Sequence, residues 1–553
     1  MFSSYRGFII RQRFYLSLGV SPSIRGFTFH QGFHLSSFTG FSFRLSPFTK
    51  IVSSNKYNLK NYTTSSTNST SSISNNSDNS ISSEKHQTSN PSKFMFLNPH
   101  LNYKHFISNS SKISENIKNR NVKDANIELV NSLYTTFCNL TTQINSKRNK
   151  RNETTKLIKQ TKLEELREKL VEQARILKEE IQKAELELEK VEKEMIQEGL
   201  KIPNDTHHEV IVGGEELAKV VKIVGVPLDS TQKGGNIIKD HMTIARELDL
   251  IDLESASNVT GTSWYYLRNA GALLELALIQ YAIYKVISKG YIPIITPDVV
   301  KTEYSDGCGF QPRDGEVSQN YFVITSPIGS VGTGNNQEIS FTLTGTAEIP
   351  LAGIYSNKVI PSSKLPIRMV GFGRAFRAEA GSRGQDTKGL YRVHQFSKVE
   401  MFCLTSPEES EEMLKEIVNI QEEIVKDLGL CFRILDMPTY ELGASAYRKY
   451  DMEAWMPGRG KWGEISSASN CTDYQSRRLN IRYKPSLSSS NESTNDRVKQ
   501  KQQSTEFVHT LNGTAIAVPR MIIAILENFQ RDDGKISIPE VLRKWMGGME
   551  FIE

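Results

Sequence analysis

The stretch RAFRAEAGSRGQDTKGLYRVHQFSKVE, residues 374–400, decides the fold of the second half of this chain. Its two flanks predict β-strands, and the three glycines between them predict a loop. Four arginines and two lysines lie on or beside that loop. So many cations on one hairpin predict either a binding site for a polyanion or a solvent-facing ladder of salt bridges.

The residues of the two strands favour a binding site. Side chains alternate between the faces of a strand, so Arg377 and Glu379 are expected to point the same way. A half-buried strand needs an apolar inner face, whereas the second strand, starting at Tyr391, would have a polar face suited to a polyphosphate beside an aromatic base. That face would carry Arg392, His394, Phe396, Lys398 and Glu400.

A second unusual stretch, TLNGTAIAVPRMIIAILENFQ at 510–530, passes from a predicted strand into a predicted helix. Pro519 suits the first helical position. Arg520 would then lie in the first turn, where the helix dipole disfavours a cation. An anionic ligand near that helix terminus would make both features favourable.

The chain from about residue 206 mixes helices and short alternating strands without a βαβ rhythm. We therefore predict an α+β domain over 206–553, built on a largely antiparallel sheet flanked by helices. Polar, low-complexity residues at 485–505 predict a flexible insertion in this domain.

Before this domain, apolar residues recur at steps of three and four from Val130 to Ile144 and again from Leu163 to Met195. Two such seams predict an antiparallel coiled-coil arm, which we place in a domain over 93–205. Its second helix, 161–199, would be about 58 Å long at 1.5 Å per residue. The expected tip, 145–162, is rich in lysine and arginine, which predicts either RNA binding or an ordinary solvated face.

Residues 1–77 hold eight lysines and arginines and no acidic residue. Because the whole chain has a formal charge of +6, residues 78–553 sum to −2, and the overall charge gives no argument for a nucleic-acid partner. The Arg-, Ser- and Phe-rich start is typical of an organelle transit peptide, with a disordered tail as the alternative. Ser/Asn-rich sequence follows, so we predict a transit peptide and disordered segment over 1–92.

Cysteine spacing and hydropathy limit the remaining possibilities. Five cysteines lie far apart without a CxxC pair, which favours free thiols in a reducing compartment over a zinc site. The longest apolar stretch, AGALLELALIQYAIYKVI at 270–287, contains Glu275 and Lys285. It therefore predicts a buried or interfacial helix, and no membrane partner is expected.

The two unusual stretches resemble motifs of a known family. The stretch from Arg377 to Glu379, the following loop and YRVHQFSKVEMF (391–402) resemble the second motif of class II aminoacyl-tRNA synthetases, specifically the seryl-tRNA synthetases. NGTAIAVPRMIIAILEN (512–528) resembles the third motif, and GYIPIITPDVV (290–300) resembles the first, which forms part of a dimer interface in this class. The arm, with RNKRNETTKLIK at 148–159, is similar to that of the seryl enzymes. The resemblance covers roughly residues 95–553.

The resemblance implies a class II catalytic domain with specific roles for individual residues. The catalytic residues would be Arg377 and Arg520. The ATP-binding residues would be Arg377, Ala378, Glu379, Val393, Phe396, Glu464, Ile465, Ser466, Ser467 and Arg520. The serine-binding residues would be Thr346, Ala347, Glu348, Arg377, Glu400 and Thr514. Arg148, Lys150 and Arg151 would bind tRNA.

Glu464 and Ser467 would also hold Mg²⁺ together with ATP, which raises a conflict with strand geometry. Simple alternation pairs Glu464 with Ser466 on one face. Either the strand contains a bulge at this point or the expected register is wrong.

The function implied is that of an ATP-dependent serine–tRNA ligase. It would form seryl-adenylate from L-serine and ATP, with Mg²⁺, and transfer serine to the 3′ end of tRNA(Ser). A homodimer in the mitochondrial matrix is expected, with a plastid-type organelle or the cytoplasm as alternatives. Two other readings are a catalytically silent RNA-binding or regulatory relative, and an amino-acid ligase acting on a carrier protein. The intact Arg377, Glu379 and Arg520 argue against the first, and the long arm argues against the second.

Overall fold

The computed structural model describes residues 97, 99–229, 237–310, 319–324, 340–379, 389–485 and 504–553. The predictions for segment 1–92, for most of the 485–505 insertion and for the loop at 380–388 lie outside these residues.

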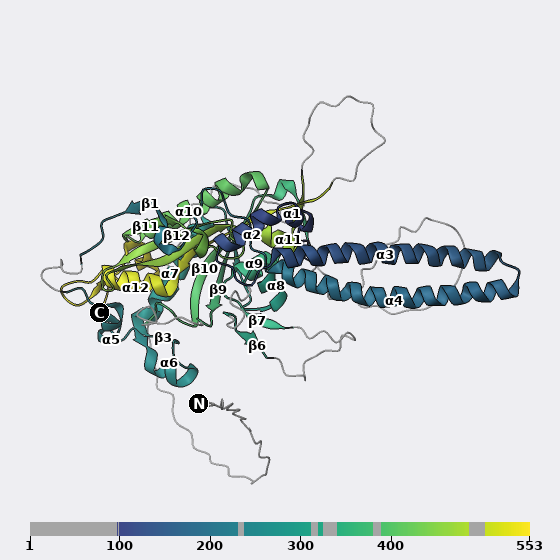
Figure 1. The fold of residues 1–553 in the computed structure, drawn as a ribbon. Helices are drawn as coiled ribbons and strands as arrows, with labels where there is room; N and C mark the ends of the chain where they lie inside the picture. Colours follow the sequence, from purple (N-terminus) through teal and green to yellow (C-terminus); the bar gives the residue numbers. More distant parts are fainter. Residues whose placement is uncertain are drawn as a thin grey trace, which may run out of the picture. The chain divides into compact units, whose positions relative to one another are not determined.

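An eight-stranded sheet organises the C-terminal part of the chain (Figure 1). Every neighbouring pair is antiparallel except β4–β9, which is parallel. The prediction of an α+β fold on a largely antiparallel sheet is therefore confirmed. In sheet order the strands are β1 (Lys219–Val224), β11 (Phe432–Asp436), β12 (Arg448–Met456), β13 (Lys461–Asn470), β16 (His509–Ala517), β10 (Gln395–Thr405), β9 (Ile367–Phe376) and β4 (Ile292–Ile295).

Three helices cover one face of this sheet: α7 (Asn269–Ile287), α10 (Ser410–Asp427) and α12 (Val518–Asn528). Alternate residues of β10, such as Val399 and Met401, point into the core that these helices close. Of the described helices, only α7 is long and apolar enough to cross a membrane, and half of it is buried inside the protein. Its apolar sequence is thus used at least partly for packing, as the prediction of a buried helix required.

The opposite face of the sheet is divided between a polar region and a second apolar cluster. Phe402 and Leu404 of β10 belong to that cluster, together with residues of α9 (Glu348–Gly353) and α11 (Tyr474–Leu479). The residues before them on the same face, Lys398 and Glu400, are polar and buried. One face of one strand therefore changes from apolar packing to a polar site along its length.

Shorter elements complete the described part of the chain. The remaining helices of this part are α5 (His241–Glu247), α6 (Leu253–Thr260), α8 (Thr302–Gly307) and α13 (Glu540–Arg543). Small sheets pair β2 (Ile251–Asp252) with β3 (Tyr266–Leu267), and β17 (Ile536–Ser537) with β18 (Phe551–Ile552). Two three-stranded sheets join β5 (Val299–Lys301), β7 (Phe341–Leu343) and β6 (Phe322–Val323), and β15 (Glu506–Phe507), β14 (Arg482–Lys484) and β8 (Val359–Pro361).

The predicted helical arm is present as α3 (Ile127–Gln160) and α4 (Glu164–Leu200), which run antiparallel after the short helices α1 (Tyr103–Ser108) and α2 (Ser110–Asn119) (Figure 1). The seam of α4 is buried or half-buried from Leu170 to Met195, as predicted. Its first two members are exceptions, because Leu163 and Leu166 are 72% and 48% exposed. Leu163 precedes α4, and α3 ends at Gln160, so these two side chains lie at the end of the hairpin where little of the partner helix remains to cover them.

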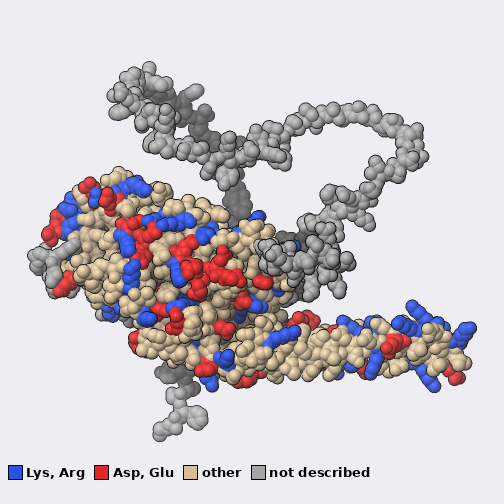
Figure 2. Space-filling model, turned by 90° about the horizontal axis from the view of Figure 1, so that it is seen from above, with Lys and Arg blue, Asp and Glu red and all other residues tan. Residues whose placement is uncertain are grey.

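The predicted basic tip, 145–162, is helical over most of its length, and the hairpin turns only at its end. The hairpin turns at residues 161–163, whereas Arg148, Lys150 and Arg151 lie within α3, with Arg151 about 15 Å from the turn at 1.5 Å per residue. The cation-rich stretch contains no Gly or Pro to end the helix, so α3 continues through it. Lysine and arginine side chains are nevertheless concentrated toward the distal end of the arm, with acidic residues among them (Figure 2).

Two buried arginine side chains hold the segment that follows the arm. Arg478 of α11 is buried and donates to the carbonyl of Ile202 at 3.1 Å. Arg120, also buried, donates to the carbonyl of Asn204 at 2.6 Å. Both carbonyls lie just after the end of α4, so two buried cations hold the chain where it leaves the arm.

Candidate active site

The site begins at the end of β9, where two details of the prediction are wrong. Strand β9 ends at Phe376, and β10 begins at Gln395, four residues after the predicted start at Tyr391. Glu379 has a φ of +47°, so Arg377 and Glu379 do not share the face of a strand. The chain leaves the strand here. The Arg377 N–H donates to the His394 carbonyl at 2.9 Å, and the next N–H, that of Ala378, donates to the Gln319 carbonyl of a different segment at 3.0 Å.

Despite this, the structure brings Arg377 and Glu379 into one pocket over the polar face of the sheet. Nine of the ten residues predicted to bind ATP line this pocket, and Ala378 is the exception. Lys398 and Arg392 add two further positive charges to the walls, and Arg377 lies 5.3 Å from the centre of the Phe396 ring. The pocket thus combines an aromatic ring with several cations, the features expected of a site for a base and a polyphosphate.

A β-bulge in β13 resolves the conflict over Glu464 and Ser467. Glu464 pairs with Glu453 of β12 and Ser466 pairs with Met452, which leaves Ile465 as an extra residue. The extra residue shifts the alternation by one, so Glu464 and Ser467 lie on the same face. Both line the pocket, and the side chain of Ile465, although it borders the pocket, is fully buried in the core.

A second bulge, in β16, brings Thr514 opposite Glu400. Val399 pairs with Ile516 and Glu400 pairs with Thr514, so Ala515 is the extra residue. The Thr514 hydroxyl donates to Glu400 Oε2 at 3.1 Å, and Lys398 Nζ lies 2.8 Å from the same oxygen. All three side chains are buried, and because buried polar groups need partners, these contacts with one another stabilise them.

Glu348, the first residue of α9, adds a second carboxylate to this buried region. Its Oε1 accepts hydrogen bonds from Gln475 Nε2 at 2.6 Å and from Asn512 Nδ2 at 2.9 Å. Burial raises the pKa of Glu348 to about 7, and the nearby Glu400 adds to the rise. This carboxyl group can therefore change its charge near neutral pH, according to whether a cation lies beside it.

Glu464 behaves in the opposite way. It forms an ion pair with Arg520, whose Nη1 lies 3.0 Å from its Oε2. Burial acts to raise the pKa of Glu464, but the charges of Arg520 and Lys449 outweigh it and lower the pKa to about 2. Helix α12 begins at Val518, so Pro519 occupies its second position, and the Glu464 carboxylate offsets the cost of a cation in the first turn.

The predicted Mg²⁺ ligands can be tested against this geometry. Mg²⁺ prefers oxygen ligands and is bound by one or two carboxylates together with the phosphates of a substrate. Glu464 is ionised, it shares a face with the Ser467 hydroxyl, and both groups open onto the pocket. The pair therefore fits a cation brought in by a nucleotide. Within the described ranges, no group of three or more His, Cys, Asp or Glu residues could hold a metal without such help.

The other predicted serine-binding residues form one buried stretch of the chain, in which Glu348 lies near Glu400. Thr346, Ala347 and Glu348 are buried at the start of α9, and they do not line the pocket itself. The three residues predicted to bind tRNA lie in α3 and are separate from this site. The five cysteines all lie in the described part of the chain, and none forms a disulfide.

Sequence reasoning missed Gln475 and Asn512, and it placed Lys398 on the polar face without its pairing to Glu400. The sequence could have indicated Asn512, because Thr510, Asn512 and Thr514 are polar residues at alternate positions of a largely apolar strand. Gln475 had no such indication. It lies 127 positions after Glu348, on another element, and its orientation is set by the Thr510 hydroxyl, which donates to Gln475 Oε1 at 2.7 Å.

Comparison with known proteins gives two matches to family profiles. Residues 332–529 match the class II core domain of the tRNA synthetases for glycine, histidine, proline, serine and threonine. Residues 101–206 match the N-terminal domain of seryl-tRNA synthetases. The two matches cover the pocket and the arm, respectively.

Individual relatives match over most of their length. The serine–tRNA ligase of Treponema denticola is 43% identical over 451 residues, which is 81% of this chain and 99% of that protein. The mitochondrial serine–tRNA ligase of Saccharomyces cerevisiae is 46% identical over 340 residues, 59% of this chain and 70% of that protein. The crystal structure of Pyrococcus horikoshii seryl-tRNA synthetase complexed with ATP is similar with a TM-score of 0.69 and 33% identity, covering 82% of this chain and 99% of that one.

Proposed function

This chain belongs to the seryl-tRNA synthetase family of class II aminoacyl-tRNA synthetases, and from that premise we propose how its residues divide the work of the reaction. The activity is ATP-dependent ligation of L-serine to tRNA(Ser). The observation that carries the assignment of roles is that one pocket gathers nine of the ten expected ATP-binding residues together with Thr514, which is hydrogen-bonded to the buried Glu400.

ATP occupies the pocket with its base between Phe396 and Arg520 and its α-phosphate near Arg377, and Arg520 also reaches the terminal phosphate. Phe396 offers an aromatic face, and Arg520, at the start of α12, offers a planar cation. Glu379 and the backbone at Val393 lie on the wall and suit contacts with the edge of the base. The cations compensate the charge of the triphosphate, which no neutral pocket could do.

L-serine binds next to ATP, between two carboxylates that have separate roles. Glu348 binds the ammonium group, with Thr346 and Ala347 next to it in the chain. Glu400 and Thr514 read the hydroxyl group, since they are hydrogen-bonded to each other and lie side by side on neighbouring strands. Arg377 attracts the serine carboxylate toward the α-phosphate.

The chemistry then needs no side-chain nucleophile. A carboxylate oxygen of serine attacks the α-phosphate of ATP, the bond to pyrophosphate breaks, and seryl-adenylate forms. A hydroxyl of the terminal adenosine of tRNA next attacks the serine carbonyl carbon, and AMP leaves. Arg377 and Arg520 act by position and charge, stabilising the negative charge that grows on the phosphate oxygens.

Glu464 and Ser467 are proposed to hold Mg²⁺ with ATP. When bound there, the ion supplies positive charge to the phosphates. The ion pair between Glu464 and Arg520 keeps both side chains ordered at the pocket wall.

The arm is proposed to bind tRNA(Ser). Lys150 has no ion-pair partner within the described residues, and Arg151 likewise has none there, so their charges are available for phosphate groups. Arg148 differs, because its guanidinium pairs with Glu185 of α4 at 2.7 Å. It is proposed to contribute to tRNA binding while it also joins the two helices.

A homodimer is proposed from the exposed apolar edge near the first motif. Strand β4 ends the large sheet, and its Ile292 and Ile295 are 57% and 90% exposed. Leu273 and Leu276 of the nearby α7 are also exposed. Apolar side chains at the free edge of a sheet are typical of an interface with another chain.

Mitochondrial location is proposed from two observations. Mitochondrial serine–tRNA ligases of yeasts are among the relatives, although bacterial enzymes are equally prominent. The acid-free residues 1–77 have the composition of a transit peptide.

One assay tests the proposed function. ATP–pyrophosphate exchange is measured with each of the common amino acids in turn. Exchange that depends on serine alone supports the assignment, and its absence with a folded enzyme would favour a silent RNA-binding protein. Charging of tRNA(Ser) transcripts then separates a complete ligase from an enzyme that only makes adenylates.

A further inference from the structure

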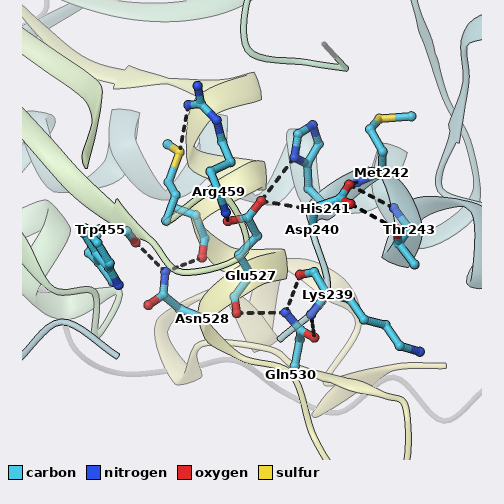
Figure 3. Close-up of polar contacts among 12 residues, drawn as sticks. Lys239, Asp240, His241, Met242, Thr243, Trp455, Arg459, Glu527, Asn528 and Gln530 are labelled. Atoms are coloured by element: carbon cyan, nitrogen blue, oxygen red, sulfur yellow. Dashed lines mark hydrogen bonds and ion pairs between the residues drawn. The ribbon is translucent and has the colours of Figure 1, made fainter. Parts of the chain in front are cut away.

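Behind the ATP pocket, three distant segments of the chain meet at the carboxylate of Glu527 (Figure 3). Glu527 lies on α12, seven residues after Arg520, and is 1% exposed. Its Oε1 accepts the backbone N–H of His241 at 3.1 Å and lies 3.2 Å from His241 Nδ1. Its Oε2 accepts the backbone N–H of Arg459 at 3.1 Å. A carboxylate can only accept, so Nδ1 of His241 carries the proton in this contact.

Two glycines show how closely the neighbouring backbone packs on this pair. A Cβ atom at Gly458 would lie 2.9 Å from Cδ of Glu527 and 2.6 Å from the carbonyl oxygen of Lys239. A Cβ atom at Gly389 would lie 2.3 Å from Nε2 of His241. No side chain fits at either distance, and Gly389 also has a φ of +69°. The backbone at both positions therefore rests directly on the histidine and the glutamate.

Both contacts lead to the wall of the ATP pocket through Tyr391. Gly389 lies two residues before Tyr391 in the segment that returns toward β10. The guanidinium of Arg459 lies 3.6 Å from the centre of the Tyr391 ring, and that of Arg520 lies 4.7 Å from it. The Tyr391 carbonyl accepts a hydrogen bond from Arg520 Nε at 3.3 Å. The position of Arg520, which lines the pocket, is thus linked to Tyr391 by two contacts.

We propose that His241 and Glu527 are positioning residues for ATP binding, an inference that rests on the proposed use of the pocket for ATP. Glu527 fixes the backbone of Arg459, and the Arg459 side chain packs on Tyr391. His241 supports the same segment two residues earlier, at Gly389. Nε2 of His241 is buried and has no hydrogen-bond partner among the described residues, so the contact between Nδ1 and Glu527 is the one that orients the ring.

The proposal assigns the pair a selective effect. Tyr391 and Arg520 belong to the wall that we assign to ATP, whereas the side chains that we assign to serine alone come from β10, β16 and the start of α9, and among them only Thr514 lines the pocket. Loosening His241 or Glu527 should therefore weaken ATP binding and leave serine binding almost unchanged. A purely structural pair would instead lower the stability of the whole domain and affect both substrates alike.

The test measures KM for ATP and KM for serine in pyrophosphate exchange, with enzyme concentrations set by active-site titration. His241→Leu removes both ring nitrogens, and we expect it to raise KM for ATP at least fivefold while KM for serine stays within twofold. His241→Asn keeps an amide N–H close to the place of Nδ1 and should restore most of the affinity for ATP. Glu527→Gln keeps the shape but turns an NH₂ group toward N–H donors, so it should act like His241→Leu.

His509→Leu is the matched control. The His509 ring contacts the Ser410 hydroxyl at 3.0 Å at the far end of β16, outside the pocket. Its loss should lower Tm without changing KM for ATP. Values of KM for ATP within twofold of wild type in both His241→Leu and Glu527→Gln would overturn the proposal, as would equal rises in both KM values.

Two further outcomes are also decisive. Should His241→Leu fail to fold, KM for ATP in Glu527→Gln decides on its own. If the wild-type enzyme shows no serine-dependent exchange, the proposed function is refuted, and the positioning role that rests on it falls as well. If the wild-type enzyme is active and KM for ATP is unchanged in the variants, only the positioning role is refuted.

Discussion

The catalytic pocket and the helical arm both carry charged groups of either sign but stabilise them differently. In the pocket, Lys398 and Glu400 are buried and pair with each other at 2.8 Å. In the arm, Arg148 and Glu185 form a pair at 2.7 Å while remaining 50% and 41% exposed. Breaking a buried pair costs about 3–5 kcal/mol, whereas an exposed pair contributes about 0–1 kcal/mol.

The difference indicates how each region tolerates change. A pocket residue is surrounded by partners from distant segments, so one substitution disturbs several contacts at once. An arm residue has mainly local neighbours and water, so replacing it changes few contacts and should have a small effect. We expect single substitutions to have large effects in the pocket and small ones in the arm, and the following predictions test that contrast from the largest effect to the smallest.

The largest effect is expected for Arg377→Ala and Arg520→Ala. Each removes a cation that is proposed to stabilise charge on the phosphates, and the loss of one such group typically reduces the rate about 10²–10³-fold. Pyrophosphate exchange with serine is the measurement, and tRNA binding should remain normal. Exchange within threefold of wild type in either variant would remove that arginine from the proposed catalytic set.

Removing the distal arm should separate the two steps of the reaction. We replace residues 141–187 with a short turn, which keeps Val130 and its apolar neighbours at the base of the arm. Charging of tRNA(Ser) should fall on the order of 10²-fold because cations that contact phosphates are lost, while exchange stays within twofold. Normal charging by the shortened protein would show that the arm has a different role.

Serine selectivity should depend on Glu400 and Thr514. Alanine fits any pocket that admits serine, so only unmade hydrogen bonds to the hydroxyl can exclude it. Hydrogen bonds to charged groups contribute about 1.5–3 kcal/mol and neutral ones about 1 kcal/mol, so Glu400→Gln should narrow the serine-over-alanine ratio about 30-fold and Thr514→Ala about fivefold.

The measurement is kcat/KM for exchange with serine and with alanine. Circular dichroism is needed as a control, because Glu400→Gln also removes the carboxylate next to the buried Lys398. If the ratio is unchanged in both variants, the hydroxyl is read by other residues.

Serine binding should weaken as the pH falls below 7. The pKa of Glu348 is raised to about 7, so its carboxylate is mostly ionised at pH 8 and mostly protonated at pH 6. Because only the ionised form attracts an ammonium group, KM for serine should rise up to about tenfold between these values. Glu348→Gln should abolish this dependence. The pKa of Glu464 is lowered to about 2, so it stays ionised and KM for ATP should change far less.

The smallest effects are expected for single cations of the arm. Lys150→Ala should weaken tRNA binding a few-fold and reduce the slope of log Kd against log salt by about one. Arg148→Ala should do the same and also lower Tm slightly, because Glu185 loses its partner. Binding is measured at several salt concentrations, with exchange as the control. A loss as large as that of Arg377→Ala would contradict the contrast between the two regions.

Sequence patterns predicted the two helices of the arm better than they predicted where the first helix ends. The steps of three and four gave the two helices and the seam from Leu170 to Met195, since a helical repeat depends only on neighbours along the chain. The turn at 161–163 lies at the end of the predicted tip, 145–162, but most of that stretch is helix and not the polar break that was expected. Lysine and arginine residues are compatible with a helix, and α3 continues through them to Gln160.

For the catalytic domain, alternation and the motif residues were enough to predict an antiparallel sheet with a polyanion site. They were not enough for the local geometry. Glu379 was expected on a strand, but it adopts a left-handed conformation where the chain turns after β9. The partnership of Gln475 with Glu348 joins residues 127 positions apart, and no local pattern encodes it.

The sequence by itself determined the secondary-structure pattern, the family and the chemical groups of the pocket, because these depend on residue type and short-range spacing. Only the tertiary structure decided which face each group occupies. The extra residues Ile465 and Ala515 shift the alternation of β13 and β16 and so place Glu464 beside Ser467 and Thr514 opposite Glu400. A bulge forms where pairing with the neighbouring strand and packing of the core favour it, and both depend on residues far away in the chain.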